Sequence, residues 1–195
     1  GKNLETFSKK ERRRIRGREL GLIPQNPGDS LNPVRKVGGQ IWEAARLRDS
    51  SGEKKETVQK LLEIFGFQKD TAKRVAGAYP FELSGGMQQR AAIARALAYE
   101  PTFIMMDEPF AALDYFTREQ MQKELLRVQQ ERSASILFVT HSIDEALILG
   151  SQIAVIEKGM VKALYEVKAP QEERNLLEDE MITLKRDIIN NLHFI

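Results

Sequence analysis

Short apolar runs alternate along this chain with longer segments in which apolar residues recur at every third or fourth position. The short runs predict strands over residues 20–24, 103–106, 135–140 and 152–156, of which 103–106 and 135–140 are expected to be buried, and a turn at residues 158–159 leads into a further short segment over residues 161–167. The longer segments predict helices over residues 34–48, 53–65, 69–76, 87–98, 117–131, 144–149 and 176–192. The sequence Thr117-Arg118-Glu119-Gln120 indicates a capping box at the start of one of these helices.

This alternation predicts an α/β fold built on a parallel sheet with right-handed crossovers. In such sheets the reactive groups collect at the carboxyl ends of the strands. Gln25, Asp107, Glu108 and His141 each follow a predicted strand. We therefore expect these side chains at one edge of the sheet.

The helical pattern of residues 41–79 predicts a helical subdomain that ends at a glycine-rich segment. We expect the chain to have four parts. They are a partial core over residues 1–40, the helical subdomain over residues 41–82, a second part of the core over residues 83–167, and a C-terminal helix over residues 168–195.

Composition narrows the class of protein. The chain has 195 residues, of which 42% are hydrophobic and 30% charged, which suits a folded soluble domain. It contains no cysteine, which excludes disulfides and thiolate zinc sites. No apolar run approaches the roughly 20 residues that a membrane span needs, and no signal peptide is visible, so we expect a cytoplasmic location.

Charge gives little support for a nucleic-acid partner. The formal net charge is only +2. Residues 1–18 are strongly basic, but apolar residues are spaced among the cations and aromatic residues for base stacking are scarce. A solvated helix face is favoured over a nucleic-acid patch, and we expect no nucleic-acid partner.

Residues 83–114 carry the candidate chemistry. Ser84, Gly85 and Gly86 begin a helix, where small residues allow close approach and free N–H groups favour an anion. Asp107 and Glu108 end a buried strand, as expected for a metal and water site. Each feature also has a plain reading, as an ordinary glycine-rich helix start or a carboxylate pair that only ends a strand. Together they suggest nucleotide hydrolysis.

These segments resemble the ATP-binding-cassette (ABC) ATPases. LSGGMQQR resembles their signature motif, FIMMDEP their Walker B strand, and FAALD their D-loop. The resemblance implies a P-loop NTPase-like parallel sheet core with a helical signature subdomain. DSLNPVRKVGGQI is similar to peptide and nickel importer ATPases, whereas VTHSIDEAL and the final helix are similar to nitrate, sulfonate and taurine importer ATPases.

The resemblance also implies roles for the strand-end residues. Asp107 would bind Mg²⁺ through water, and Glu108 would be the general base or would orient the attacking water. Gln25 would be the Q-loop glutamine, which contacts Mg²⁺ and senses the membrane partner. His141 would be the switch histidine, which donates to the γ-phosphate of ATP and holds Glu108 in line.

The signature and D-loop residues would act across a dimer. Ser84, Gly85 and Gly86 would hold the γ-phosphate of an ATP bound by the opposite subunit. Asp114 would end the D-loop that links the two sites. Met87 replaces the glutamine of the shorter LSGGQ pattern but keeps its backbone N–H, so the phosphate site should survive.

The implied function is the ATP-hydrolysing subunit of an ABC transporter of the importer type, with ATP and Mg²⁺ as cofactors. Its expected partners are a second ATP-binding subunit, transmembrane permease subunits and an external substrate-binding protein. It would lie at the cytoplasmic face of the membrane, and its cargo is left open.

One motif of the family is missing from the sequence. No G-x-x-x-x-G-K-[ST] segment, the Walker A motif, occurs in these residues. We therefore expect a fragment that lacks the N-terminal strands and the P-loop, binds ATP weakly if at all, and has a sheet without its central strand.

Two other functions stay open on the sequence alone. A chromosome or DNA-repair ATPase head would share the signature and Walker B motifs, although no sustained heptad pattern accompanies them here. A non-catalytic interaction fragment could retain the motifs without turnover.

Overall fold

The computed structural model describes residues 4–16, 19–48, 53–111, 113–132, 134–169, 171 and 174–192. The chain forms two compact units, Gly1–Val139 and Thr140–Ile195. The four parts expected from the sequence were defined by motifs, whereas these two units are defined by packing. The four-part division therefore stays a prediction.

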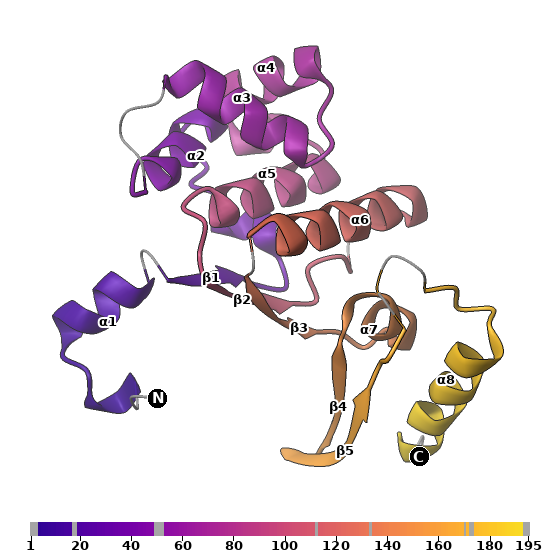
Figure 1. The fold of residues 1–195 in the computed structure, drawn as a ribbon. Helices are drawn as coiled ribbons and strands as arrows, with labels where there is room; N and C mark the ends of the chain where they lie inside the picture. The colour runs from indigo at the N-terminus through magenta and orange to yellow at the C-terminus, as the bar shows by residue number, and fades with distance from the viewer. Residues whose placement is uncertain are drawn as a thin grey trace. The chain divides into compact units, whose positions relative to one another are not determined.

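A three-stranded parallel sheet forms the base of the first unit (Figure 1). Its strands β1 (Leu20–Ile23), β2 (Phe103–Asp107) and β3 (Ser135–Val139) lie side by side in that order. Ile23 is paired with Met106, and Asp107 with Val139, so the three carboxyl ends meet at one edge. The predicted α/β fold with a parallel sheet is confirmed.

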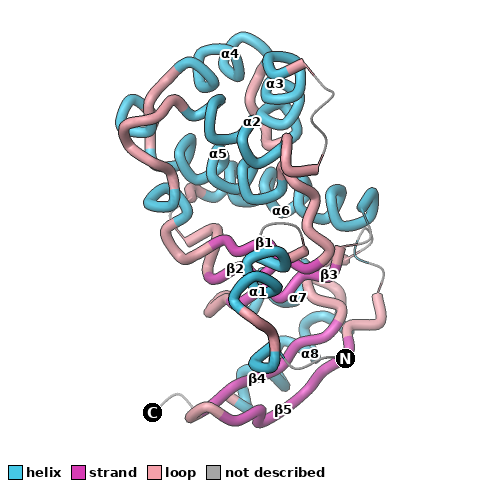
Figure 2. Tube along the Cα trace, turned by 90° about the vertical axis from the view of Figure 1, so that its left-hand side faces the viewer, coloured by secondary structure: helices cyan, strands magenta, loops and turns pink. Residues whose placement is uncertain are grey.

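Burial alternates along these strands. Ile23, Ile104 and Met106 are buried, and helices α5 (Gly85–Leu97) and α6 (Tyr115–Arg132) lie along one side of the sheet (Figures 1 and 2). The intervening Leu22 and Leu137 are 57% and 51% exposed. Parallel sheets are normally covered on both faces, whereas here apolar side chains of the alternate positions face solvent.

The predicted helical subdomain is built from α2 (Val37–Ala45), α3 (Lys54–Ile64) and α4 (Lys69–Gly77), which pack beyond α5 as seen from the sheet (Figure 2). Arg90 of α5 fastens this layer. Its guanidinium lies 4.3 Å from the centre of the Phe67 ring, and its Nη1 donates to the carbonyl of Gly66 at 3.0 Å.

Short elements precede the sheet or connect its parts. A basic helix, α1 (Lys9–Arg16), precedes β1, and Lys9, Lys10 and Arg12 are exposed as the sequence predicted. Three 3₁₀ turns complete the first unit: η1 (Leu4–Thr6), η2 (Pro27–Ser30) and η3 (Pro80–Glu82).

The start of α6 differs from the sequence prediction. The helix begins at Tyr115 and not at Thr117, and no capping box forms at Thr117. Instead, the Asp114 carboxylate accepts hydrogen bonds from the Thr117 backbone N–H at 3.1 Å and from its hydroxyl at 2.7 Å. An aspartate one residue before the helix satisfies the same free N–H more directly.

The second unit pairs a hairpin with two helices. Strands β4 (Gln152–Glu157) and β5 (Met160–Glu166) are antiparallel and turn at the predicted Lys158-Gly159. Its core joins α7 (Ile143–Leu149), the hairpin and α8 (Asp179–Asn191) through residues that include Leu147, Val155 and Met181. The strands of the described residues thus form two separate sheets.

No helix within the described part of the chain is both long enough and apolar enough to cross a bilayer.

Arg174 links the segment before α8 to the end of α7 by hydrogen bonds. Its Nη1 donates to three carbonyls at the end of α7, those of Leu147 at 2.9 Å, Ile148 at 3.0 Å and Gly150 at 2.8 Å, and its Nε donates to Ala169 at 2.9 Å. The last carbonyls of a helix lack partners within the helix, so this side chain satisfies them. Burial lowers the pKa of the Arg174 guanidinium.

We expect Arg174→Ala to lower the free energy of unfolding of the second unit by roughly 1–3 kcal/mol, because several charge-assisted hydrogen bonds are lost together. Urea denaturation of the 195-residue chain measures it. Arg186→Ala, which alters an exposed arginine of α8, should change it little. Equal effects of the two substitutions would contradict this role.

The side-chain amide of Gln89 in α5 is buried without hydrogen bonds to the described residues. Gln89 is 3% exposed, and neither polar atom of its side chain has a hydrogen-bond partner among the described residues. Gln89→Met keeps the volume and removes the unsatisfied groups, so it should raise the free energy of unfolding by about 1 kcal/mol. The exposed Gln68→Met is the control in the same denaturation experiment, and a loss of stability on Gln89→Met would show that its amide is bonded.

Candidate functional site

The carboxylate pair lies where β2 ends. Asp107 is the last residue of β2 and is exposed. Glu108 follows with a φ of 43°, a left-handed conformation that non-glycine residues rarely adopt. Its N–H donates to the carbonyl of Val139 at 2.9 Å, and Pro109 behind it is buried. Backbone strain of this kind is concentrated at functional sites.

Gln25 reaches this pair from the neighbouring strand. It lies two residues beyond the end of β1, and its Nε2 is 3.4 Å from Glu108 Oε2, a long hydrogen bond between residues 83 positions apart. The contact follows from the parallel register, because Ile23 and Met106 are paired just before the two strands end.

The donor set at this edge suits Mg²⁺. The ion needs only one or two carboxylates from a protein and otherwise keeps waters or binds phosphate oxygens. Asp107 and Glu108 supply carboxylates and Gln25 an amide oxygen. Among the described residues there is no group of three or more acidic or histidine side chains that would enclose a metal.

His141 belongs to the second unit, two residues after the end of β3. Hydrogen bonds fix the backbone around it: the hydroxyl of Thr140 donates to Glu145 Oε2 at 2.7 Å and accepts from the N–H of Ser142 at 3.0 Å. Ser142 in turn caps α7. The structure thus brings Gln25 and Glu108 together within the first unit, whereas His141 is held by the second.

The glycine-rich segment forms the N-terminus of α5. Ser84 occupies the position before the helix, and Gly85 is its first residue rather than the predicted Met87. Ser84 and Gly85 are exposed. A Cβ added to Gly85 would meet no atom of the described chain within 4 Å, so packing within this chain does not require glycine there. Gly86 lies beside Leu113: a Cβ atom added to Gly86 would be 3.5 Å from Leu113 Cδ2.

Asp114 faces its own helix. Hydrogen bonds from the Thr117 side chain and backbone lower the pKa of the Asp114 carboxyl. The carboxylate therefore stabilises α6 at any pH above its ordinary pKa, and the contribution is lost as the pH falls through the lowered value.

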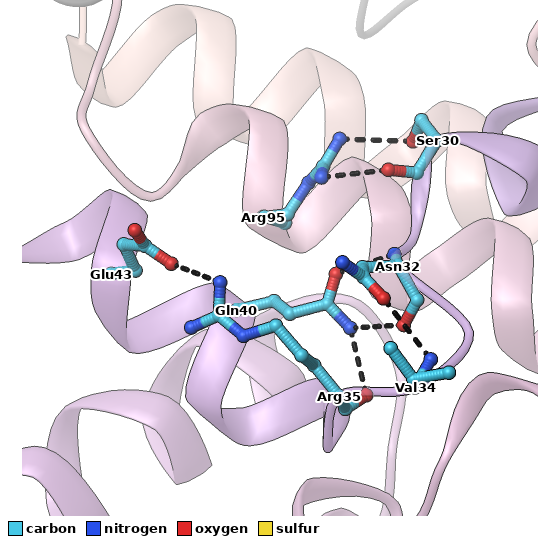
Figure 3. Close-up of polar contacts among 7 residues, drawn as sticks. All are labelled: Ser30, Asn32, Val34, Arg35, Gln40, Glu43 and Arg95. Atoms are coloured by element: carbon cyan, nitrogen blue, oxygen red, sulfur yellow. Dashed lines mark hydrogen bonds and ion pairs between the residues drawn. The ribbon is translucent and has the colours of Figure 1, made fainter.

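The sequence did not point to the side chains that hold the segment after Gln25. Gln40 of α2 accepts a hydrogen bond at its Oε1 from the N–H of Asn32 at 2.8 Å. Its Nε2 donates to the carbonyls of Asn32 at 3.0 Å and Arg35 at 2.9 Å (Figure 3). Arg95 of α5 binds Ser30 in the same view. Gln40 is distinguished by its burial, because it is only 5% exposed. Burial of a polar residue cannot be inferred from the spacing of residues in the sequence.

Comparison with known proteins places this arrangement in a family. The ABC transporter family matches residues 1–111. The chain is 40% identical over 153 residues to the taurine import ATP-binding protein of Rhizobium johnstonii, covering 77% of this chain and 56% of that protein. It is 37% identical over 163 residues to the oligopeptide transport ATP-binding protein of Bacillus subtilis, covering 83% of this chain and 45% of that protein.

The fold agrees with these matches. A dimeric ATP-binding cassette solved in a post-hydrolysis state with ADP and Pi has a TM-score of 0.74 and 27% identity, covering 84% of this chain and 69% of that one. The chain spans about half the length of the curated relatives it matches. On the family match, the relatives and the shared fold, this chain belongs to the ABC transporter family.

Proposed function

We propose that this chain is part of the ATP-binding and ATP-hydrolysing subunit of an ABC importer. One observation carries the proposal: Gln25 and Glu108, distant in sequence, meet at the carboxyl ends of adjacent parallel strands, 3.4 Å apart. This is the edge at which α/β sheets bind ligands. ATP and Mg²⁺ are the proposed cofactors, and Mg²⁺ would neutralise phosphate charge when bound.

Each residue at this edge has a proposed task. Asp107 would hold Mg²⁺ through its waters, and Gln25 would add a neutral oxygen. Glu108 accepts the proton of the attacking water or holds that water in line, and its fixed backbone supports such positioning. For His141, which belongs to the second unit, we propose a separate task, donation to the γ-phosphate. Phosphoryl transfer needs mainly this positioning and charge neutralisation.

The signature acts on a second subunit. Ser84, Gly85 and Gly86 present the free N–H groups of a 13-residue helix, a favourable position for phosphate. Since a methyl group added at residue 85 would meet nothing within this chain, we attribute a need for glycine there to an approach from outside it. We assign that approach to ATP held by a second ATP-binding subunit, with the Asp114 segment linking the two sites.

A membrane partner would dock beside the loop that follows Gln25. The N–H of Val37 donates to the carbonyl of Ala78 at 2.9 Å, so this loop borders the segment that precedes the signature. Val34 is 79% exposed and Phe81 is 72% exposed, as expected for contacts with a permease helix. An external substrate-binding protein and a position at the cytoplasmic membrane face complete the proposal.

The other readings have less support. The family match and the importer relatives favour transport over a chromosome or DNA-repair head. Taurine and peptide importers match almost equally well, so we propose no cargo. A non-catalytic fragment is separated from an enzyme by the hydrolysis experiments below.

We expect Glu108→Gln to lower ATP hydrolysis at least about 100-fold, because the carboxylate that handles the attacking water is lost. The test uses a hybrid in which residues 1–195 replace the matching segment of the Bacillus subtilis oligopeptide transport ATP-binding protein. Phosphate release from MgATP is measured, and Glu124→Gln in α6 is the control. Unchanged hydrolysis in the Glu108→Gln hybrid would exclude Glu108 from the reaction.

Gly85→Ala separates stability from function. Alanine favours a helix by up to about 1 kcal/mol over glycine, and nothing in this chain obstructs the added methyl group. We therefore expect an equal or higher melting temperature of the 195-residue chain together with lower ATPase activity of the hybrid. Gly39→Ala, also unobstructed but within α2, should leave activity unchanged. Full activity of Gly85→Ala would contradict the proposed contact.

A further inference from the structure

One face of the signature helix contacts the chain on both sides of Gln25. The residues are Gln88 and Arg95 of α5 and Tyr99, two residues beyond its end, which we call the α5 stripe. Gln88 and Arg95 are seven residues apart, about two helical turns, and Tyr99 is about one turn further. All three therefore project from the same side.

Two members of the stripe bracket Gln25. The hydroxyl of Tyr99 donates to the carbonyl of Leu20, the first residue of β1, at 2.9 Å. Arg95 Nη1 donates to the carbonyl of Ser30 at 2.8 Å and Nη2 to its hydroxyl oxygen at 3.0 Å (Figure 3). Gln25 lies midway between these anchors, five residues from each.

Gln88 joins the same segment to the signature. Its Nε2 donates to the carbonyls of Pro80 at 2.7 Å and Leu83 at 3.1 Å, directly before Ser84. It also packs against η2, because a Cβ added to Gly28 would lie 3.0 Å from Gln88 Oε1 and 3.3 Å from its Cβ. Such an approach leaves little room for a side chain at residue 28.

The Arg95 contact is not an ordinary surface ion pair. Arg95 is partly buried, and both of its bonds to Ser30 end on neutral oxygens. Burial lowers the pKa of the guanidinium because it penalises the charged form. A buried cation needs hydrogen bonds to replace its lost solvation. Arg95 makes these bonds to Ser30, and they hold the loop after Gln25 in place.

We propose that the α5 stripe positions Gln25 relative to the signature tip, with Arg95 as the positioning residue. Since Ser84 to Gly86 begin the helix that carries the stripe, a shift of that tip is transmitted to the loop of Gln25, and the reverse also holds. The catalytic part of this inference rests on the proposed function, whereas the mechanical part does not.

The mechanical part is tested on the 195-residue chain by amide hydrogen exchange. In Arg95→Met, the amides of Asp29 and Leu31, which close η2, should exchange at least about 5-fold faster, with the α5 amides unchanged. Ser30→Ala, which removes only the hydroxyl acceptor, should have a smaller effect. Arg74→Lys, an exposed residue of α4, is the control. Unchanged exchange of Asp29 and Leu31 in Arg95→Met overturns the inference.

The catalytic part is tested in the hybrid described above. We expect Arg95→Met to lower kcat about 10-fold and to leave the KM for ATP within about 2-fold, because the stripe positions a group without touching nucleotide. Arg95→Lys should recover part of kcat through a bond to the Ser30 carbonyl. If the stripe only stabilises the fold, Arg95→Met would lower the melting temperature and leave kcat per folded molecule unchanged. That result would overturn the positioning role.

The two proposals fail differently. An unmutated hybrid that folds but does not hydrolyse ATP contradicts the proposed function, and the exchange result then decides the mechanical part alone. An active hybrid whose kcat is insensitive to Arg95→Met contradicts only the further inference.

Discussion

Backbone pairing of β1, β2 and β3 decides where the strand-end candidates of the first unit lie, which are Gln25, Asp107 and Glu108. In the observed register Ile23 is paired with Met106 and Asp107 with Val139, so Gln25 and Glu108 leave the sheet side by side. A slip of β2 by one residue would turn Ile104 and Met106 from the buried to the exposed side. The burial of these two side chains therefore fixes the position of the polar site at the strand ends.

The same sheet edge holds Glu108 in an unfavourable backbone conformation. A left-handed non-glycine residue costs on the order of 1 kcal/mol or more. The bond from its N–H to the carbonyl of Val139 and the buried Pro109 and Phe110 behind it oppose relaxation. The core thus offsets this local cost and holds the backbone of Glu108 in place. Helix α5 contacts β1 and begins at the signature residues.

The sequence predicted most elements because their signals are local. Periodic apolar residues located the helices, and short apolar runs located the strands. The errors lie at two helix starts, where one local signal overrides another. The helix after the D-loop begins at Tyr115 because Asp114 caps it, although Thr117-Arg118-Glu119-Gln120 looked like a capping box. The signature helix begins at Gly85, two residues before Met87, because exposed glycine tolerates the first helical position.

The candidate site was less fully predictable. Strand ends suggested Gln25, Asp107, Glu108 and His141, and the structure brings Gln25 to Glu108. The positive φ of Glu108 could not be predicted, because glutamate rarely adopts it and only the folded chain shows it. Arg95 looked like any arginine of an alanine-rich helix, because its partner Ser30 lies 65 residues away and only the folded chain brings them together.

A crystal structure of the hybrid carrying Glu108→Gln, grown with MgATP, would show whether the strand-end and signature residues surround one nucleotide. We expect a dimer in which residue 108, Asp107 and Gln25 surround the γ-phosphate and its Mg²⁺ in one subunit, while Ser84 and Gly85 of the other subunit close over the same phosphate. Bound nucleotide that lies away from Gln25 and residue 108 in a sheet of unchanged register would contradict it.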